Sequence, residues 1–257
     1  MNSNFLNLWQ YRSLIFHFSL LEIKMRYKES YLGFIWTAVE PLLMFVILFI
    51  VFTSIREPTQ EHFAIYLITG VIIYHLFSKG TMGGLNCLRS NQGILKTLSL
   101  NRMFFPIVST TATTIMMMVE LMVFFSMMPF LGFSPSWTLL LYPLIIILLL
   151  SLVLGMSFFL SVLYIRVPDI QPFWTIIVFT LLFVSPVFWS VDEATGILLS
   201  IQEINPLGQI IELAHQLVFH EIPEINDWLY TSTIVFSILG LGYVFFKKFE
   251  NNVVERL

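Results

Sequence analysis

Long apolar runs constrain this 257-residue chain more than any other feature of its sequence. A helix rises about 1.5 Å per residue, so about 20 apolar residues cross a hydrocarbon core roughly 30 Å thick. Charged residues make up only 11% of the chain, whereas soluble domains carry about 25%. The sequence therefore predicts an all-α integral membrane protein with six transmembrane helices, at Gly33–Ile55, Phe63–Ser78, Phe104–Leu131, Trp137–Ile165, Ile170–Trp189 and Trp228–Phe246. We expect the second span to continue through residues 80–84.

The basic residues are distributed unequally between the loops. The chain holds 13 Lys and Arg residues, and all of them except Arg56 fall in one set of alternate loops or in the termini. Cytoplasmic loops of membrane proteins carry an excess of Lys and Arg. The distribution therefore predicts that both termini are cytoplasmic, which agrees with an even number of spans.

The segment before the first span has a helical apolar stripe. Its apolar side chains recur every three or four residues, and it ends in the charges of Lys24, Arg26 and Lys28. An amphipathic helix of this kind lies along a membrane surface rather than across it. The sequence predicts an N-terminal interface helix whose stripe consists of Phe5, Leu8, Tyr11, Ile15, Phe18, Leu21 and Met25.

The segment between the fifth and sixth spans, Ser190–Asp227, contains seven acidic residues and no Lys or Arg. Within it, Asn205-Pro206 has the composition of a helix start, with Asn as the cap and Pro in the first turn. The helical stripe that follows is too short to span a membrane. We expect short outer-face helices here, which either dip into the outer leaflet or lie upon it.

The chemistry of the chain excludes several classes of function. The sequence has no G-x-x-x-x-G-K-[ST] loop, so we expect no ATPase site. His215 and His220 are five residues apart, which is the wrong spacing for a paired zinc site, so we expect neither a metal nor a cofactor in this chain. Two carboxylates lie within spans. Glu40 reaches the interface in one interpretation, and Glu120 either bonds to a Ser or Thr of another helix or takes part in transport.

The first span and three later segments resemble a known family. The stretch "MRYKESYLGFIWTAVEPLLMFVILFIVF" (Met25–Phe52) is similar to the first-span signature of permeases of type II ABC exporters of polysaccharides and polyol phosphates. In that family, a basic and aromatic stretch precedes Leu-Gly-x-x-Trp and a later Pro, here Arg26, Tyr27, Lys28, Leu32, Gly33, Trp36 and Pro41. The resemblance continues in "LITGVIIYHLFSKG", in "NQGILKTLSLNRMFFPI" and in Asn205-Pro206-Leu207. One departure is the loop Tyr164–Ile170, which separates Arg166 from Asp169 by two residues where many members have them adjacent.

The resemblance implies a transporter half rather than an enzyme. Two copies would form the channel in the inner membrane, and a separate ATP-binding subunit would bind ATP and Mg. The substrate implied is a polyprenyl-diphosphate-linked glycan of the O-antigen or capsule type, or a teichoic-acid-like polyol phosphate, and no nucleic acid. The implied layout is a cytoplasmic region with the interface helix at 1–32, the exporter domain at 33–249 and a cytoplasmic tail at 250–257.

The same resemblance suggests roles for three sets of residues. Lys24, Arg26, Tyr27 and Lys28 would contact the diphosphate of the substrate, although these charges could instead only orient the first span. A helical step of four places Lys24 and Lys28 on one face, so Arg26 with Tyr27 is the favoured pair if the helix breaks there. The loops that couple to the ATPase would contain Arg89, Asn91, Lys96, Arg102, Arg166 and Asp169. The aromatics that could line the pore and stack on sugar rings are Trp36, Phe173, Trp174, Phe179 and Phe183, although interfacial belts and helix packing also account for such aromatics.

Two other classes of function stay open at this point. An ion-coupled secondary carrier would depend on Glu120 and would need no ATPase. A membrane-embedded transferase of lipid-linked glycans would need a cluster of acids, His or Ser at one interface, which the cytoplasmic loops lack.

Overall fold

The computed structural model describes residues 11–55, 62–97 and 101–250. Within these residues the chain is helical and contains no β-strand, which confirms the all-α prediction for the described part. The helices are α2 (Arg12–Arg26), α3 (Trp36–Ile55), α4 (Phe63–Ser90), α5 (Gln92–Thr97), α6 (Phe104–Met127), α7 (Tyr142–Arg166), α8 (Ile170–Val184), α9 (Ile197–Ile204), α10 (Pro206–Val218) and α11 (Ile225–Phe249).

Five of the predicted spans correspond to helices that are long and apolar enough to cross a membrane. The fifth predicted span, Ile170–Trp189, is different, because α8 has only 15 residues. It ends where Ser185 becomes extended, and Ser185 precedes Pro186, whose ring disfavours helical geometry in the residue before it. A helix of this length covers about 22 Å. The count of six spans therefore stays a prediction.

Helix α4 forms the centre of the bundle and packs against α3, α6, α7 and α10. It continues without a break through the glycines that follow Ser78, as the sequence predicts, and reaches Ser90. Glycine allows its close approach to α7, since a methyl group added at Gly84 would come within 1.9 Å of the Ser157 hydroxyl. Small residues at such contacts are typical of membrane helices that pack backbone to backbone.

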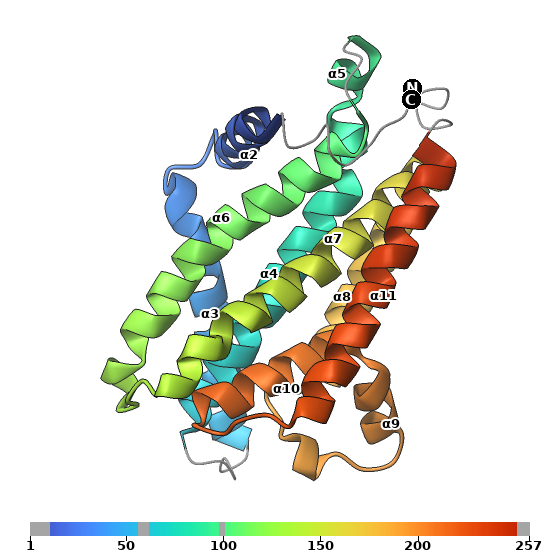
Figure 1. The fold of residues 1–257 in the computed structure, drawn as a ribbon. Helices are drawn as coiled ribbons and strands as arrows, with labels where there is room; N and C mark the ends of the chain where they lie inside the picture. Colours follow the sequence, from blue (N-terminus) through green and yellow to red (C-terminus); the bar gives the residue numbers. More distant parts are fainter. Residues whose placement is uncertain (1–10, 56–61, 98–100, 251–257) are drawn as a thin grey trace.

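The two ends of the bundle differ (Figure 1). Helices α2 and α5 and the C-terminal end of α11 lie at one end, and α9 and α10 lie at the opposite end. We call these the α2 end and the α10 end.

Helix α2 crosses the α2 end and packs on α6 (Figure 1). It buries Ser19 and Ile23, and the Ser19 hydroxyl donates to the Val108 carbonyl of α6 at 2.9 Å. Leu21 and Met25 of the predicted stripe are exposed, at 51% and 64%. Exposed apolar side chains on this helix fit an interface position, which stays a prediction. Two stripe residues, Phe5 and Leu8, lie outside the described residues.

The predicted cap of α10 is confirmed. The Asn205 side chain accepts a hydrogen bond from the Leu207 backbone N–H at 3.2 Å and donates to the Ser185 hydroxyl at 2.9 Å. The apolar stripe of α10 is buried against α4, α7 and α11, so this face contacts protein rather than lipid. Its members are Leu207, Ile210, Ile211, Ala214, Leu217 and Val218.

Candidate functional site

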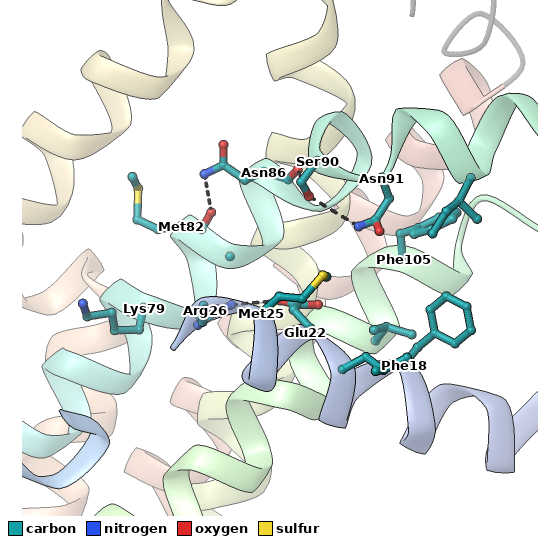
Figure 2. A pocket seen from close by; sticks show the side chains of 14 residues that line it. Phe18, Glu22, Met25, Arg26, Lys79, Met82, Asn86, Ser90, Asn91 and Phe105 are labelled. Carbon is teal, nitrogen blue, oxygen red and sulfur yellow. Dashed lines mark hydrogen bonds and ion pairs between the residues drawn. The ribbon is translucent and has the colours of Figure 1, made fainter. Parts of the chain in front are cut away.

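A groove of about 650 Å³ lies between α2, α4 and α6 at the α2 end (Figure 2). Most of its lining is apolar, and polar side chains of α2, of α4 and of the turn after α4 line the remainder. The apolar residues are Phe18, Leu21, Met25, Met82, Ile94, Phe105 and Val108, and the polar ones include Asn86, Ser90 and Asn91. A groove with this lining fits an amphipathic ligand better than a fully polar one.

Two basic residues, Arg26 and Lys79, line this groove and also line a smaller polar cavity of about 190 Å³ next to it. Arg26 Nη2 lies 2.9 Å from Glu22 Oε1, and Lys79 Nζ lies 2.6 Å from Glu40 Oε1. The Arg26 guanidinium rests against α4, because a methyl group added at Gly83 would come within 2.6 Å of Nη2. Each cation of the groove is thus paired with a carboxylate of the same chain.

The smaller cavity contains a chain of polar side chains from three spans. His75 Nδ1 of α4 lies 3.2 Å from both carboxylate oxygens of Glu120 on α6. His75 Nε2 lies 3.6 Å from Glu40 Oε2 on α3. His75 and Glu120 are buried, with only 6% and 3% of their surface exposed. Buried charges persist in proteins when they are paired, so this cluster ties α3, α4 and α6 together.

The structure corrects one sequence interpretation of the intramembrane carboxylates. The partner of Glu120 is His75 rather than a Ser or Thr of another helix. Glu40 is half-exposed and bonds to Lys79. Sequence reasoning did not single out His75, Lys79 or Glu22. The sequence does contain one signal that groups His75 with Lys79. Residues 75, 79 and 83 are spaced four apart, so they share one face of α4.

The structure separates the four residues that were predicted to contact the diphosphate. Helix α2 ends at Arg26, and Tyr27 follows it in a non-helical conformation. Tyr27 lines the polar cavity together with Arg26, and its hydroxyl accepts a hydrogen bond from Thr37 at 3.3 Å. Lys24 and Lys28 are exposed and line neither cavity. The condition for the pair Arg26 and Tyr27 is therefore met, since the helix ends between them. The ligand role of these residues stays a prediction.

The residues predicted to couple to the ATPase lie at the α2 end. Three arginines connect helices there. Arg89 of α4 lies over the Tyr164 ring of α7 at 4.8 Å, and Arg166 of α7 lies over the Phe249 ring of α11 at 3.8 Å. Arg102 donates to the Glu250 carbonyl.

The other three predicted coupling residues are near these arginines in sequence. Lys96 is exposed on α5, and Asp169 is exposed just before α8. The Asn91 side chain donates back to the Cys87 carbonyl of α4 at 2.8 Å, and the Ser90 hydroxyl donates back to Asn86 at 2.9 Å. Both side chains thus bond to carbonyls of the last turns of α4 and do not cap the N-terminus of α5. The structure brings the coupling set to one end of the bundle, and their contact with a partner stays a prediction.

The predicted pore aromatics fall on different faces. Trp174 is buried, and its indole N–H donates to the Thr81 hydroxyl at 3.2 Å, which attaches α8 to α4. Phe173, Phe179 and Phe183 are exposed on α8, at 60%, 61% and 48%. Trp36 is half-buried at the start of α3. Three of the five aromatics are therefore available to a ligand, a lipid or a second copy of the chain.

Comparison with known proteins connects this fold to a family. A sequence profile described as "ABC-2 type transporter" matches residues 14–219, which include nearly all of α2 and every helix from α3 to α10. The O-antigen export system permease protein RfbA of Myxococcus xanthus is 22% identical over 259 residues, which cover 97% of each chain. A protein of the same name from Klebsiella pneumoniae is 24% identical over 92% of each chain. The polysialic acid transport protein KpsM of Escherichia coli is 24% identical over 77% of this chain and 78% of its own.

The matched residues contain the groove, the polar cluster and the helices α9 and α10 together. The match covers most of a chain whose described residues contain helices and no strand, five of these helices being long and apolar enough to cross a membrane. The protein therefore belongs to the ABC-2 type transporter family.

Proposed function

We propose that this chain is the permease half of an ATP-driven exporter in the inner membrane. Its substrate is a polyprenyl-diphosphate-linked polysaccharide of the O-antigen or capsule type, or a polyol-phosphate polymer, which it moves out from the cytoplasmic side. Two copies form the channel, and an ATP-binding partner that binds ATP and Mg drives it. The names of the similar proteins, which concern O-antigen export and polysialic acid transport, support this substrate class.

The observation that carries the proposal is the amphipathic groove. Its apolar lining suits a polyprenyl chain, and the two cations at its junction with the polar cavity suit a diphosphate. Arginine offers a planar, two-pronged contact to phosphate, whereas lysine acts as a point charge. A lipid-linked diphosphate has both an apolar chain, which suits the apolar lining, and a negative headgroup, which suits the two cations.

The direction of transport follows from the orientation proposed for the α2 end. The sequence assigns all Lys and Arg residues except Arg56 to the loops and termini of one side, and of these the structure places Lys79 inside α4. This distribution predicts that the side that carries them is cytoplasmic. The groove, α5 and the coupling arginines then face the cytoplasm, where the lipid-linked polymer is made and where ATP is available. The ATP-binding partner docks on this end.

The dependence on a partner gives a direct test. The purified chain is expected to hydrolyse no ATP, because its sequence contains no phosphate-binding loop. Copurified with its ATP-binding subunit, the complex is expected to hydrolyse ATP, faster when the lipid-linked polymer is added. Hydrolysis by the isolated chain after removal of every copurifying ATPase would refute the proposal.

Replacement of Arg26 by Lys tests the recognition of the diphosphate. Lys preserves the charge that orients the first span but lacks the fork, so we expect normal insertion and an export rate reduced by roughly tenfold, on the scale of one lost charge-assisted hydrogen bond. Lys24→Arg is the matched control, since Lys24 is exposed and lines neither cavity. Export by Arg26→Lys at the wild-type rate would rule out bidentate recognition by this side chain.

An ion-coupled secondary carrier is the second candidate, and the Glu40–His75–Glu120 cluster is the observation that favours it. Ionisable groups buried in membrane helices often form relays in such carriers. This function predicts transport without any ATPase present, abolished by Glu120→Gln. Transport that stops when the ATP-binding subunit is removed excludes it.

A further inference from the structure

Acidic residues of the chain already bind the two cations of the groove. Glu22 binds Arg26 at 2.9 Å, one helical turn away on α2. Glu40 of α3 binds Lys79 of α4 at 2.6 Å. All four side chains are partly exposed, at 20% for Glu22, 27% for Arg26, 43% for Glu40 and 44% for Lys79. An anion that enters the groove can therefore reach both pairs.

The two cations also line the same cavities, so a ligand that fills these cavities meets both of them. The Arg26 guanidinium lies against Gly83, and Lys79 is one turn earlier on the same face of α4. Both side chains line both cavities. Figure 2 shows Arg26 of α2 next to Lys79 of α4, with Met25 of α2 beside Arg26.

We infer that Glu22 and Glu40 are internal anions that occupy Arg26 and Lys79 while the groove is empty, and that the diphosphate of a lipid substrate displaces both. This inference rests on the proposed function, and it adds a mechanism of selection to it. A headgroup with one phosphate can replace one carboxylate, whereas a diphosphate can replace two. The site thereby discriminates against the monophosphate lipids that surround it in the membrane.

Each carboxylate has a second partner in place for the displaced state. The Ser109 hydroxyl already donates to Glu22 Oε1 at 3.2 Å. His75 Nε2 lies 3.6 Å from Glu40 Oε2, is buried, and has no hydrogen-bond partner among the described residues. When the His75 ring carries a proton on both nitrogens, a small movement of Glu40 away from Lys79 gives the Nε2–H its acceptor. Since an unsatisfied buried polar atom costs free energy, the new bond offsets part of the lost ion pair.

The movement of Glu40 toward His75 also couples ligand binding in the groove to the interior of the bundle. His75 Nδ1 is bonded to Glu120 on α6, so a shift of Glu40 toward His75 reaches a third span through one imidazole ring. The cluster thus connects the occupancy of the groove with the packing of α3, α4 and α6.

The experiment measures binding of farnesyl diphosphate, a short soluble probe, to the full-length chain in nanodiscs of neutral phosphatidylcholine. Glu22→Gln and Glu40→Gln each remove a competitor, so each is expected to tighten binding by roughly fivefold, the scale of one partly exposed ion pair. Glu29→Gln is the matched control, because Glu29 is exposed just after α2 and lines neither cavity. Farnesyl monophosphate is expected to bind more weakly than the diphosphate to the wild-type chain.

A double-mutant cycle separates displacement from a general change in charge. In a Lys79→Gln background, Glu40→Gln is expected to bring no further gain, because the cation that Glu40 occupied is gone. A gain that persists there, or Glu→Gln variants that bind no tighter than Glu29→Gln, would overturn the inference. If inorganic diphosphate binds as tightly as farnesyl diphosphate, the groove does not recognise the lipid chain. That result would also overturn the inference.

The outcomes distinguish this inference from the proposed function. If ATP-driven export occurs but farnesyl diphosphate binding ignores Glu22 and Glu40, only the displacement mechanism is wrong. If the binding pattern is as expected but the complex with its ATPase exports nothing, the proposed function is wrong.

Discussion

Replacing Gly242 by Val is expected to abolish the folded protein almost completely. Helices α7 and α11 meet backbone to backbone at this point, because a methyl group added at Gly242 would come within 2.2 Å of the Gly155 carbonyl oxygen. On the α7 side, a methyl group at Gly155 would come within 2.8 Å of the Leu239 backbone. Backbone atoms cannot move aside as a flexible side chain can. In lipid, helix association depends on this close packing, so a larger residue separates the two helices.

The measurement is the fraction of monodisperse protein after extraction in a mild detergent, followed by size-exclusion chromatography. Gly240→Val is the control, because a methyl group at Gly240 would meet nothing within 4 Å and this residue lies on the same helix. Both substitutions add the same β-branched side chain, so the helix propensity of the two variants is matched. Equal yields of monodisperse protein from both variants would contradict the packing described for α7 and α11.

Replacing His75 by Leu is expected to cause a large loss of stability, second only to that of Gly242→Val. The change leaves the Glu120 carboxylate buried in the bundle without its hydrogen-bonded partner. Removal of one member of a buried pair typically costs about 3–5 kcal/mol, since the remaining charge stays desolvated. The apparent melting temperature of the purified protein should therefore fall sharply.

The double variant His75→Leu/Glu120→Leu distinguishes the loss of a partner from the loss of packing. When both polar groups become apolar, the uncompensated carboxylate disappears, and stability is expected to return most of the way to wild type. Glu40 and Lys79 are unchanged in both variants, so their ion pair serves as a constant background. A double variant that is less stable than His75→Leu would show that the pair contributes more than mutual compensation.

The sequence predicts the helices of this protein better than it predicts the site. Apolar runs report local burial, and the long helix α4 and the Asn205 cap depend on local signals that sequence reasoning identifies. The limit appears at α8, where Pro186 ends the helix earlier than the apolar run suggests. Mean hydropathy does not reveal this break. Ser185 and Pro186 end the helical backbone geometry, whereas the segment around them stays apolar in composition.

The site could be predicted only in part, because it depends on which helices pack together. Lys24, Arg26 and Lys28 are close in sequence, yet the end of α2 at Arg26 leaves the two lysines exposed while Arg26 turns to the groove. Lys79 completes the basic pair from a helix whose place beside α2 no local pattern reveals. The same applies to His75 and Glu120, which lie 45 residues apart and meet only through the contact of α4 with α6.

Transport in inverted membrane vesicles tests the central claim most directly. The vesicles expose the cytoplasmic face, contain the chain with its ATP-binding subunit, and carry the lipid-linked polymer in their outer leaflet. With ATP added, the polymer is expected to become protected from an external glycosidase, and this protection should persist when a protonophore dissipates the proton gradient. Protection without ATP that the protonophore abolishes would contradict the account and identify an ion-coupled carrier instead.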